Sequence, residues 1–180
     1  MPFDTTTLPT FSVERLRASK ITTVRDSLET VAAAGIIARH RRTTTSTTTT
    51  TEVGVVRLDD IPVLLGRLYH IYTSSIQLAS SVNNDGLAAN LRHTTDGSTP
   101  SPSSTVLTSF RNQQVNATTG FTGVISVVFA PGSDLALSLL LCVARITGTG
   151  NAQMSGSATF PIDLVIEDIG VDPGSTGTNI

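Results

Sequence analysis

The chain of 180 residues contains a single cysteine, no tryptophan and few charges. One cysteine excludes an intrachain disulfide, and Cys142 lies in the apolar run 135–144, where a thiol usually acts as a small hydrophobic side chain. Charged residues make up 14% of the chain, well under the roughly 25% of ordinary globular domains. With 12 basic and 14 acidic residues, the protein has little field to attract a polyanion, so we expect no direct nucleic-acid binding.

Segments that direct a protein to or across a membrane are also missing. The first residues have neither the basic nor the apolar region of a secretory signal peptide. The run 135–144 is the longest apolar stretch and is about half as long as a membrane span. We therefore expect a protein that is made in the cytoplasm, is not exported by a signal peptide and has no membrane partner.

Threonine, by contrast, is abundant, with 29 residues. It is β-branched and polar, which suits a strand face in contact with water. Clusters of Gly, Pro, Asn and Asp, which favour turns, separate short apolar segments in the part of the chain after residue 51. These segments lie near 52–58, 67–79, 87–93, 104–110, 119–130, 134–147 and 157–167. The spacing predicts an all-β fold, an antiparallel β-sandwich of the jelly-roll type.

The pattern divides the chain into three parts. Residues 1–25 carry prolines and threonines without clear periodicity and are predicted to form an extended N-terminal arm. Residues 26–172 are predicted to form the β-sandwich, and residues 173–180 an exposed C-terminal tail. The stretch Asp26–Arg42 is ambiguous, because Asp26 or Ser27 could cap a short helix. Its Val and Ile content favours a strand.

Two further segments carry structural predictions. Thr43–Thr51 consists of threonine apart from Ser46, which is compatible with a flexible linker or with a solvated hairpin. Its short length between apolar segments favours an ordered or semi-ordered hairpin. The run Leu135–Ile146 is almost continuously apolar, which predicts a central strand covered on both faces. The second sheet would cover one face and a partner subunit the other.

Side chains suited to catalysis are few. The histidines His40, His70 and His93 have no neighbouring His, Cys or carboxylate in a ligand arrangement, so no zinc site is indicated. The motifs of serine nucleophiles do not occur, and Cys142 has no basic neighbour closer than Arg145. We predict no catalytic residue and a protein that is not an enzyme.

Two acidic pairs are candidate metal ligands. Asp59-Asp60 and Glu167-Asp168, with Asp163 nearby, could offer oxygens to calcium. The chain has no Asp-x-Asp-x-Asp loop of the kind that binds calcium. We interpret the pairs as solvated strand ends and predict no metal and no cofactor.

Four short motifs follow one another in the second part of the chain: Arg57-Leu58-Asp59-Asp60-Ile61-Pro62, Gly66-Arg67-Leu68-Tyr69, Leu91-Arg92 with Asp96-Gly97, and Leu164-Val165-Ile166-Glu167-Asp168-Ile169-Gly170. In this order, the segment from Arg57 to Pro173 resembles a jelly-roll module of virion proteins from tailed bacteriophages that infect actinobacteria. The resemblance implies a capsid decoration protein, a head fibre or a minor tail protein, usually oligomeric. It brings no catalytic residues, and the first 50 residues lie outside it.

The resulting hypothesis is a structural virion protein, a capsid decoration protein that binds and stabilises the assembled shell. A nearly neutral, threonine-covered sandwich suits symmetric packing, in which many repeated contacts add up. The predicted partners are copies of the chain, as a trimer by analogy with similar proteins, and the major capsid protein. The arm would become ordered on a neighbouring subunit. Its Arg15, Arg17 and Arg25 are the predicted partner-binding residues.

The alternative hypothesis is a minor tail or receptor-binding module that adheres to a host cell-surface glycan. Loop residues such as Asn83, Asn84 or Asp96 would then carry the affinity. The lack of tryptophan counts against this function. Tyr69 and Tyr72 do not add up to a stacking platform either, because side chains three apart on a strand lie on opposite faces.

Overall fold

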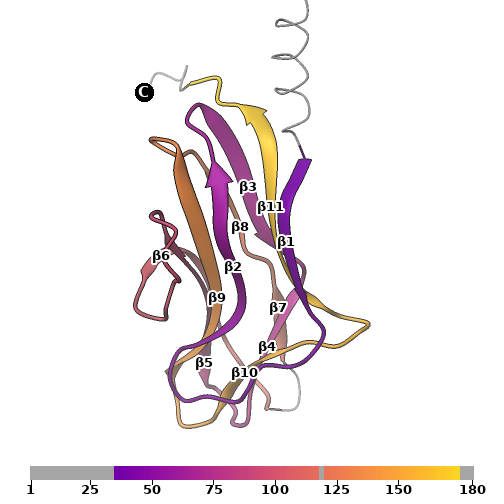
Figure 1. Ribbon diagram of the computed structural model, residues 1–180. Coiled ribbons are helices and arrows are strands. Elements are labelled where there is room, and N and C mark those ends of the chain that lie inside the picture. Colours follow the sequence, from indigo (N-terminus) through magenta and orange to yellow (C-terminus); the bar gives the residue numbers. More distant parts are fainter. Residues whose placement is uncertain (1–34, 118–119, 175–180) are drawn as a thin grey trace, which may run out of the picture.

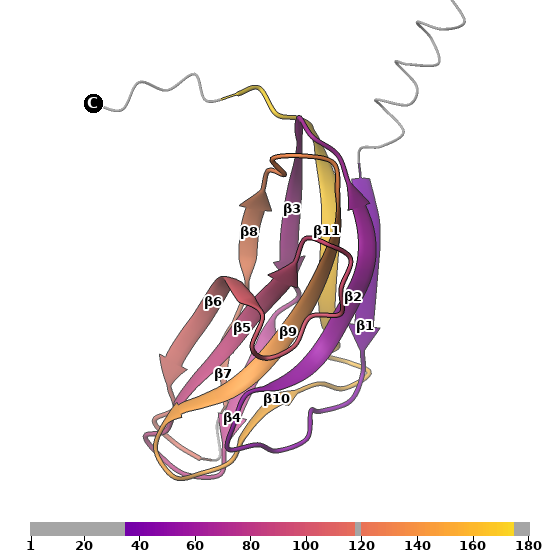
Figure 2. The same cartoon turned by 60° about the vertical axis from the view of Figure 1, so that its left-hand side comes forward.

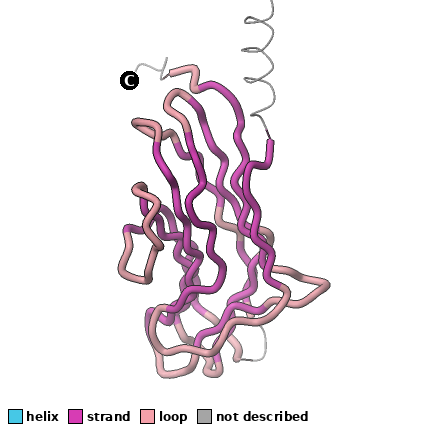
Figure 3. The backbone as a smooth tube through the Cα atoms, in the orientation of Figure 1, coloured by secondary structure: helices cyan, strands magenta, loops and turns pink. Residues whose placement is uncertain are grey.

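The computed structural model describes residues 35–117 and 120–174 (Figure 1). Every regular element in these ranges is a β-strand (Figure 3), and none of their residues forms a helix that could cross a membrane. The strands are β1 (Gly35–Arg42), β2 (Val53–Val63), β3 (Arg67–Thr73), β4 (Ile76–Ser80), β5 (Gly86–Thr94), β6 (Thr105–Gln113), β7 (Phe121–Gly123), β8 (Ser126–Phe129), β9 (Leu135–Thr147), β10 (Ala152–Ser155) and β11 (Ile162–Val171). The predicted all-β fold is confirmed.

The strand pairing is that of a long hairpin rolled into two layers. β1 pairs with β11, β2 with β9, β3 with β8 and β5 with β6, all antiparallel. These nested pairs give two four-stranded sheets, in the orders β1-β11-β3-β8 and β2-β9-β5-β6. The sheets face each other across the core (Figure 2). This is the jelly-roll arrangement of the predicted sandwich.

A third sheet, β10-β4-β7, continues the first layer beyond a bend. At the bend, side-chain hydroxyls replace regular strand pairing. The hydroxyl of Ser74 donates to the carbonyl of Pro161 (2.8 Å) and accepts from the amide of Asp163 (2.9 Å). The hydroxyl of Thr73 accepts from the amide of Ile125 (3.0 Å). Three backbone groups at the bend are thus satisfied by side chains.

The core lies between the layers, and β9 is its central strand. Its inward side chains alternate along the strand and are fully buried, together with those of β3, β4 and β11: Leu137, Leu139, Leu141, Val143, Ile71, Leu78, Leu164 and Ile166. Each buried leucine or isoleucine stabilises the fold by about 1.5–3 kcal/mol relative to exposure. The alternation explains why the apolar segments of the sequence became strands.

The outward side of β9 is covered by the protein's own chain, and the prediction that a partner subunit covers it is wrong. Ser138 and Cys142 are fully buried, and Leu140 is nearly so. Leu140 packs over Gly54 of β2, where a Cβ atom would come within 2.8 Å of the leucine. The loop after β5 also meets β9, through a backbone bridge between Asp96 and Ala136.

The threonine-rich segment connects β1 in one sheet to β2 in the other. It pairs with β10 and not with itself, so it does not form the predicted hairpin. Thr49 exchanges two backbone hydrogen bonds with Ala152, both 2.8 Å long. Ser46, the one residue of the run that is not threonine, is buried, and its hydroxyl accepts from the amide of Met154 (2.9 Å). Of the stretch 26–42, residues 35–42 form β1 and the others lie outside the described residues.

Candidate functional site

Metal-binding chemistry is not assembled in the described part of the chain. Nowhere in residues 35–117 and 120–174 do three His, Cys, Asp or Glu side chains converge so as to hold a metal ion. The three histidines lie apart. His70 stacks on Tyr72, with ring centroids 4.7 Å apart, and contacts the hydroxyl of Ser126 (2.8 Å). His93 meets the edge of Phe129.

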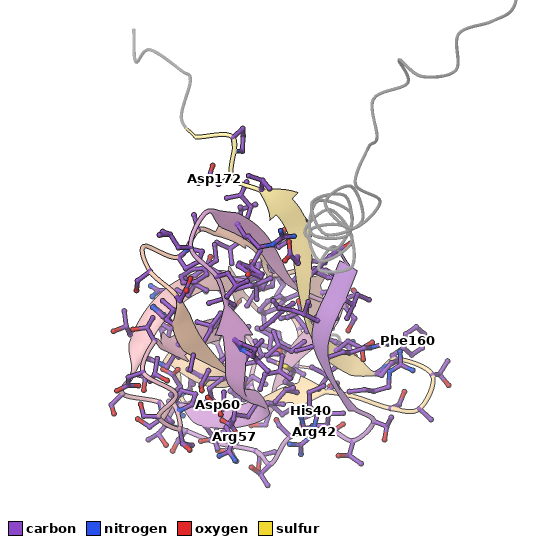
Figure 4. All side chains as sticks on the ribbon, turned by 45° about the horizontal axis from the view of Figure 1, so that its top comes forward. His40, Arg42, Arg57, Asp60, Phe160 and Asp172 are labelled. Atoms are coloured by element: carbon purple, nitrogen blue, oxygen red, sulfur yellow. The ribbon has the colours of Figure 1, made fainter. Side chains whose placement is uncertain are left out.

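His40 and Arg42 instead link the two layers at one side of the sandwich (Figure 4). The Nδ1 of His40 lies 2.9 Å from the carbonyl oxygen of Arg57. The guanidinium of Arg42 donates to the carbonyl of Val55 (2.9 Å). Both carbonyls belong to β2, which is an edge strand. Side chains of β1 thus cap backbone acceptors of an edge that could otherwise pair with another chain.

Of the acidic residues singled out in the sequence, Asp59, Asp163 and Asp168 are held by arginines. Asp163 and Asp168 are buried, so their interpretation as solvated strand ends is wrong. Arg39 and Arg41 both bind Asp163, at 3.0 and 2.9 Å, and the hydrogen bond from Arg41 is the largest influence that keeps the pKa of Asp163 below its ordinary value. Arg67 forms a bidentate pair with Asp168 (2.5 and 2.7 Å), and both side chains are buried. These carboxylates stabilise strand contacts.

Cys142 lies beside a third ion pair, on the outer side of β9. Arg92 holds Glu52 with two hydrogen bonds of 2.5 and 2.7 Å, and Asn90 donates to the same carboxylate (3.1 Å). Burial, followed by the charge of Glu52, raises the pKa of the Cys142 thiol to about 12. The thiol therefore stays protonated near neutral pH and is a poor nucleophile, which agrees with its interpretation as a small buried side chain.

At the end of the sandwich where the β4–β5 and β9–β10 turns lie, two buried side chains hold the turns together. Asp85 accepts hydrogen bonds from the hydroxyl of Ser80 (2.5 Å) and from the amides of Thr149 (3.1 Å) and Gly150 (2.9 Å). The amide group of Gln114 binds both the N–H and the C=O of Ser80 (2.5 and 3.0 Å). We call this the closed end.

The opposite end exposes apolar side chains. The amide of Asp172, after β11, donates to the carbonyl of Gly66 in the β2–β3 turn (2.8 Å), and Gly35 at the start of β1 pairs with Asp168 of β11. Three segments thus meet here, at the end where the first and last described residues lie (Figure 1). We define the apolar end as six side chains that are 39–63% exposed: Ile36, Ile37, Leu64, Leu65, Ile169 and Val171.

The sequence did not single out this surface. Leu64 and Leu65 form two consecutive apolar residues in a turn, which is a usable signal of an exposed apolar patch. The predicted partner residues Arg15, Arg17 and Arg25 lie outside the described residues. Consequently, the arm 1–25 and its contacts stay a prediction.

The loop residues considered for glycan binding do not come together. The side chain of Asn83 accepts from the amide of Ala117 (2.5 Å), and Asn84 adopts a positive φ of 63° in the β4–β5 turn. Asp96 accepts from the amide of Ser98 (3.0 Å) in the loop after β5. The nine residues of β5 separate the two turns by about 30 Å. These residues shape turns and do not form one site.

The described surface includes a larger and a smaller hollow. The larger, of about 500 Å³, is lined by Thr45, Ser75, Gln77, Thr122, Ser155, Gly156, Ser157 and Phe160. The smaller, of about 350 Å³, lies at the loop after β5 and is lined by His93, Thr94, Thr95, Asp96, Ser103, Ser104 and Thr105. Neither was predicted, because each collects residues from segments distant in sequence.

The chain is thus a jelly-roll protein whose most distinctive surfaces are an apolar end and a polar hollow. No protein-family model matches the sequence, and no curated protein matches it. Among solved structures it is similar to the VP2 subviral particle protein of infectious bursal disease virus, at 9% identity and a TM-score of 0.40, over 74% of this chain and 38% of that one.

Two further structures of this virus are similar. The Gt strain matches at 10% identity and a TM-score of 0.38, over 77% of this chain and 37% of that one. The Gx strain matches at 12% identity and a TM-score of 0.34, over 79% and 35%. The present chain therefore spans little more than a third of these proteins.

Proposed function

We propose that this chain is a non-enzymatic structural protein of a virus particle, a capsid decoration protein of a tailed bacteriophage that attaches to the assembled shell. The observation that carries the proposal is the apolar end. Six large apolar side chains from the start of β1, the β2–β3 turn and the end of β11 are exposed at the same end of the sandwich. Exposed apolar groups of this kind mark surfaces that bind other proteins.

The contrast with the rest of the surface supports attachment through this end. Backbone acceptors of the β2 edge are capped by His40 and Arg42, which discourages pairing of another strand at that side. The closed end satisfies its turn amides internally through Asp85. Burial of the apolar end against a partner would contribute a favourable free energy of roughly 25 cal/mol per Å² of apolar surface.

Oligomerisation belongs to the same proposal. A shell presents many identical sites, so a weak contact at each is multiplied when several copies act together. Pairing of Arg15, Arg17 and Arg25 with acidic groups of the shell would add to the apolar contact. Ion pairs of this kind are screened by salt, so their share of the binding is expected to fall as ionic strength rises.

The experiment is co-sedimentation of the purified chain with shells of the encoding phage that were assembled without it. The wild type is expected to saturate the shells at a fixed stoichiometry. A Leu65→Ser/Val171→Ser variant is expected to bind at least about tenfold more weakly, because two apolar contacts are lost. Val82→Ser/Val115→Ser removes two exposed valines outside the apolar end and is the matched control.

Two results would contradict the proposal. If the wild type does not bind shells, attachment to the capsid is ruled out. If the two double variants bind equally well, the apolar end is not the attachment surface. Circular dichroism of each variant checks that the β fold is intact before binding is compared.

A further inference from the structure

The larger hollow has a floor built from three strands in register. Ser155 on β10 lies opposite Gln77 on β4, and Gln77 lies opposite Thr122 on β7. These side chains form a row across the outer face of the β10-β4-β7 sheet. Thr45 and the β10–β11 loop stand beside this row and bound a volume of about 500 Å³. This volume is in the range of small-molecule sites.

The polar groups of this floor are available to a ligand. The side chains of Ser75, Gln77, Thr122 and Ser155 have no hydrogen-bond partner among the described residues. Together they offer three hydroxyls and one amide, all of which can both donate and accept. An apolar occupant would leave these groups unsatisfied, at a cost of about 1–3 kcal/mol for each one that it buries. A suitable ligand therefore carries many hydrogen-bonding groups of its own.

An aromatic ring stands at the edge of the hollow. Phe160 is 75% exposed and projects from the β10–β11 loop, away from the body of the protein (Figure 4). The loop is held in shape, since Ser157 donates its amide to the carbonyl of Phe160 and its hydroxyl accepts from the amide of Phe160, both at 3.0 Å. The hydroxyl of Thr45 also contacts the backbone of Gly156 (3.3 Å). The aromatic ring of Phe160 is thus carried by a loop whose shape is fixed by hydrogen bonds.

The lining contains no charged side chain, so an ionic ligand would lose hydration without gaining a counter-charge. A ligand that fits must be neutral, rich in hydroxyls and able to place an apolar face on a ring. We propose that the hollow binds a neutral saccharide, whose hydroxyls bond with Gln77, Thr122 and Ser155 while a sugar face packs on Phe160. Phe160 thus provides the aromatic stacking surface that Tyr69 and Tyr72 do not form.

This site goes beyond the proposed attachment to a shell and does not depend on it. The hollow is built on β4, β7 and β10, which lie toward the closed end (Figure 1). A protein attached through its apolar end would therefore turn the hollow outward. Saccharide binding is measured on the isolated chain, so its failure is distinguishable from a failure of shell binding.

The test is to titrate the full chain with a fixed panel of sugars and to measure binding by saturation-transfer NMR and calorimetry. The neutral probes are maltose, cellobiose, lactose and diacetylchitobiose, and the charged probes are glucose 6-phosphate and galacturonic acid. At least one neutral probe is expected to bind with a Kd of about 1 mM or better, and the charged probes more weakly. Phe160→Ala and Gln77→Ala are each expected to weaken that binding about tenfold.

Gln153→Ala is the matched control for Gln77→Ala. Gln153 lies two residues before Ser155 on β10 and does not line the hollow. Val115→Ala, at an 81% exposed side chain, is the control for removing an exposed apolar group. Absence of binding by every neutral probe overturns the proposal, and so does binding that survives both Phe160→Ala and Gln77→Ala. Tighter binding of the charged probes also overturns it, since it would require a site with charge.

Discussion

At the closed end, the turn backbone is hydrogen bonded to two buried polar side chains. At the apolar end, the β2–β3 turn exposes leucines, and the ends of β1 and β11 expose isoleucine and valine. Asp85 and Gln114 are each 1% exposed, and Leu65 and Val171 are 62% and 63% exposed. Both ends belong to the same two layers, so the difference does not come from the topology. It comes from which residues occupy the turns and the strand ends.

Only the closed end is complete without a partner. A buried polar network stabilises only when its members are satisfied, and the closed end meets that condition through several internal bonds. The apolar end leaves a surface that gains free energy when covered.

The largest effect is expected at the buried ion pair between Arg67 and Asp168, which lies at the same end of the sandwich as the exposed apolar side chains. Arg67→Ala leaves Asp168, whose side chain is 3% exposed, without its cation, at an expected cost of about 3–5 kcal/mol in the free energy of unfolding. Urea denaturation measures the change. Arg57→Ala, which breaks the exposed pair with Asp59, should cost no more than about 1 kcal/mol. Equal losses would mean that burial of the pair is unimportant.

Gln114→Ala tests the closed end and should cost about 2–3 kcal/mol, because it leaves the backbone of Ser80 without partners in a buried place. The neighbouring Gln113→Ala is the control, since that side chain is exposed and bonds only to the carbonyl of Asn84. Its expected cost is about 0.5 kcal/mol or less. Similar unfolding midpoints for the two variants would refute the role of Gln114.

Asp85 makes the closed end sensitive to acid. The hydrogen bond from Ser80, followed by the amide bonds, holds the pKa of Asp85 below its ordinary value. A carboxyl with a lowered pKa in the folded state contributes stability above its unfolded pKa and loses it as pH falls through the folded pKa. The midpoint of thermal unfolding at pH 7 should therefore be higher for the wild type than for the Asp85→Asn variant. This difference should shrink toward pH 2. A difference that is constant with pH would contradict the assignment.

The smallest effect on stability is expected at the exposed residues of the apolar end. Leu65→Ser/Val171→Ser should change the free energy of unfolding by about 0.5 kcal/mol or less per site, because neither side chain is buried in the free protein. The same variant is expected to lose shell binding. A large loss of stability would mean that these side chains support the fold of the isolated chain.

Parts of the fold were predictable because their signal is local. The apolar run Leu135–Ile146 predicted a central strand, and β9 is that strand. The burial of the outward side of β9 by the chain itself was not predictable. Gly54, Leu140 and the loop at Asp96 meet only in the folded sheet. Likewise, the threonine-rich segment is held in place by backbone hydrogen bonds to β10, which lies about a hundred residues further along the chain.

The candidate sites were less predictable than the fold. Gln77, Thr122 and Ser155 are ordinary surface residues in the sequence, and only strand register places them in one row. Phe160 could be recognised as an aromatic residue in a turn-rich stretch, but its position beside that row could not. The arm residues Arg15, Arg17 and Arg25 stay a prediction.

The sequence by itself determined that this chain forms β layers. Threonine content, alternating apolar segments and turn residues act over a few positions, and each favours strands wherever the chain is placed. Tertiary structure alone decided which strands pair and hence which surfaces exist. Contacts such as Arg39 with Asp163 join residues 124 positions apart, and no local preference specifies a partner at that distance.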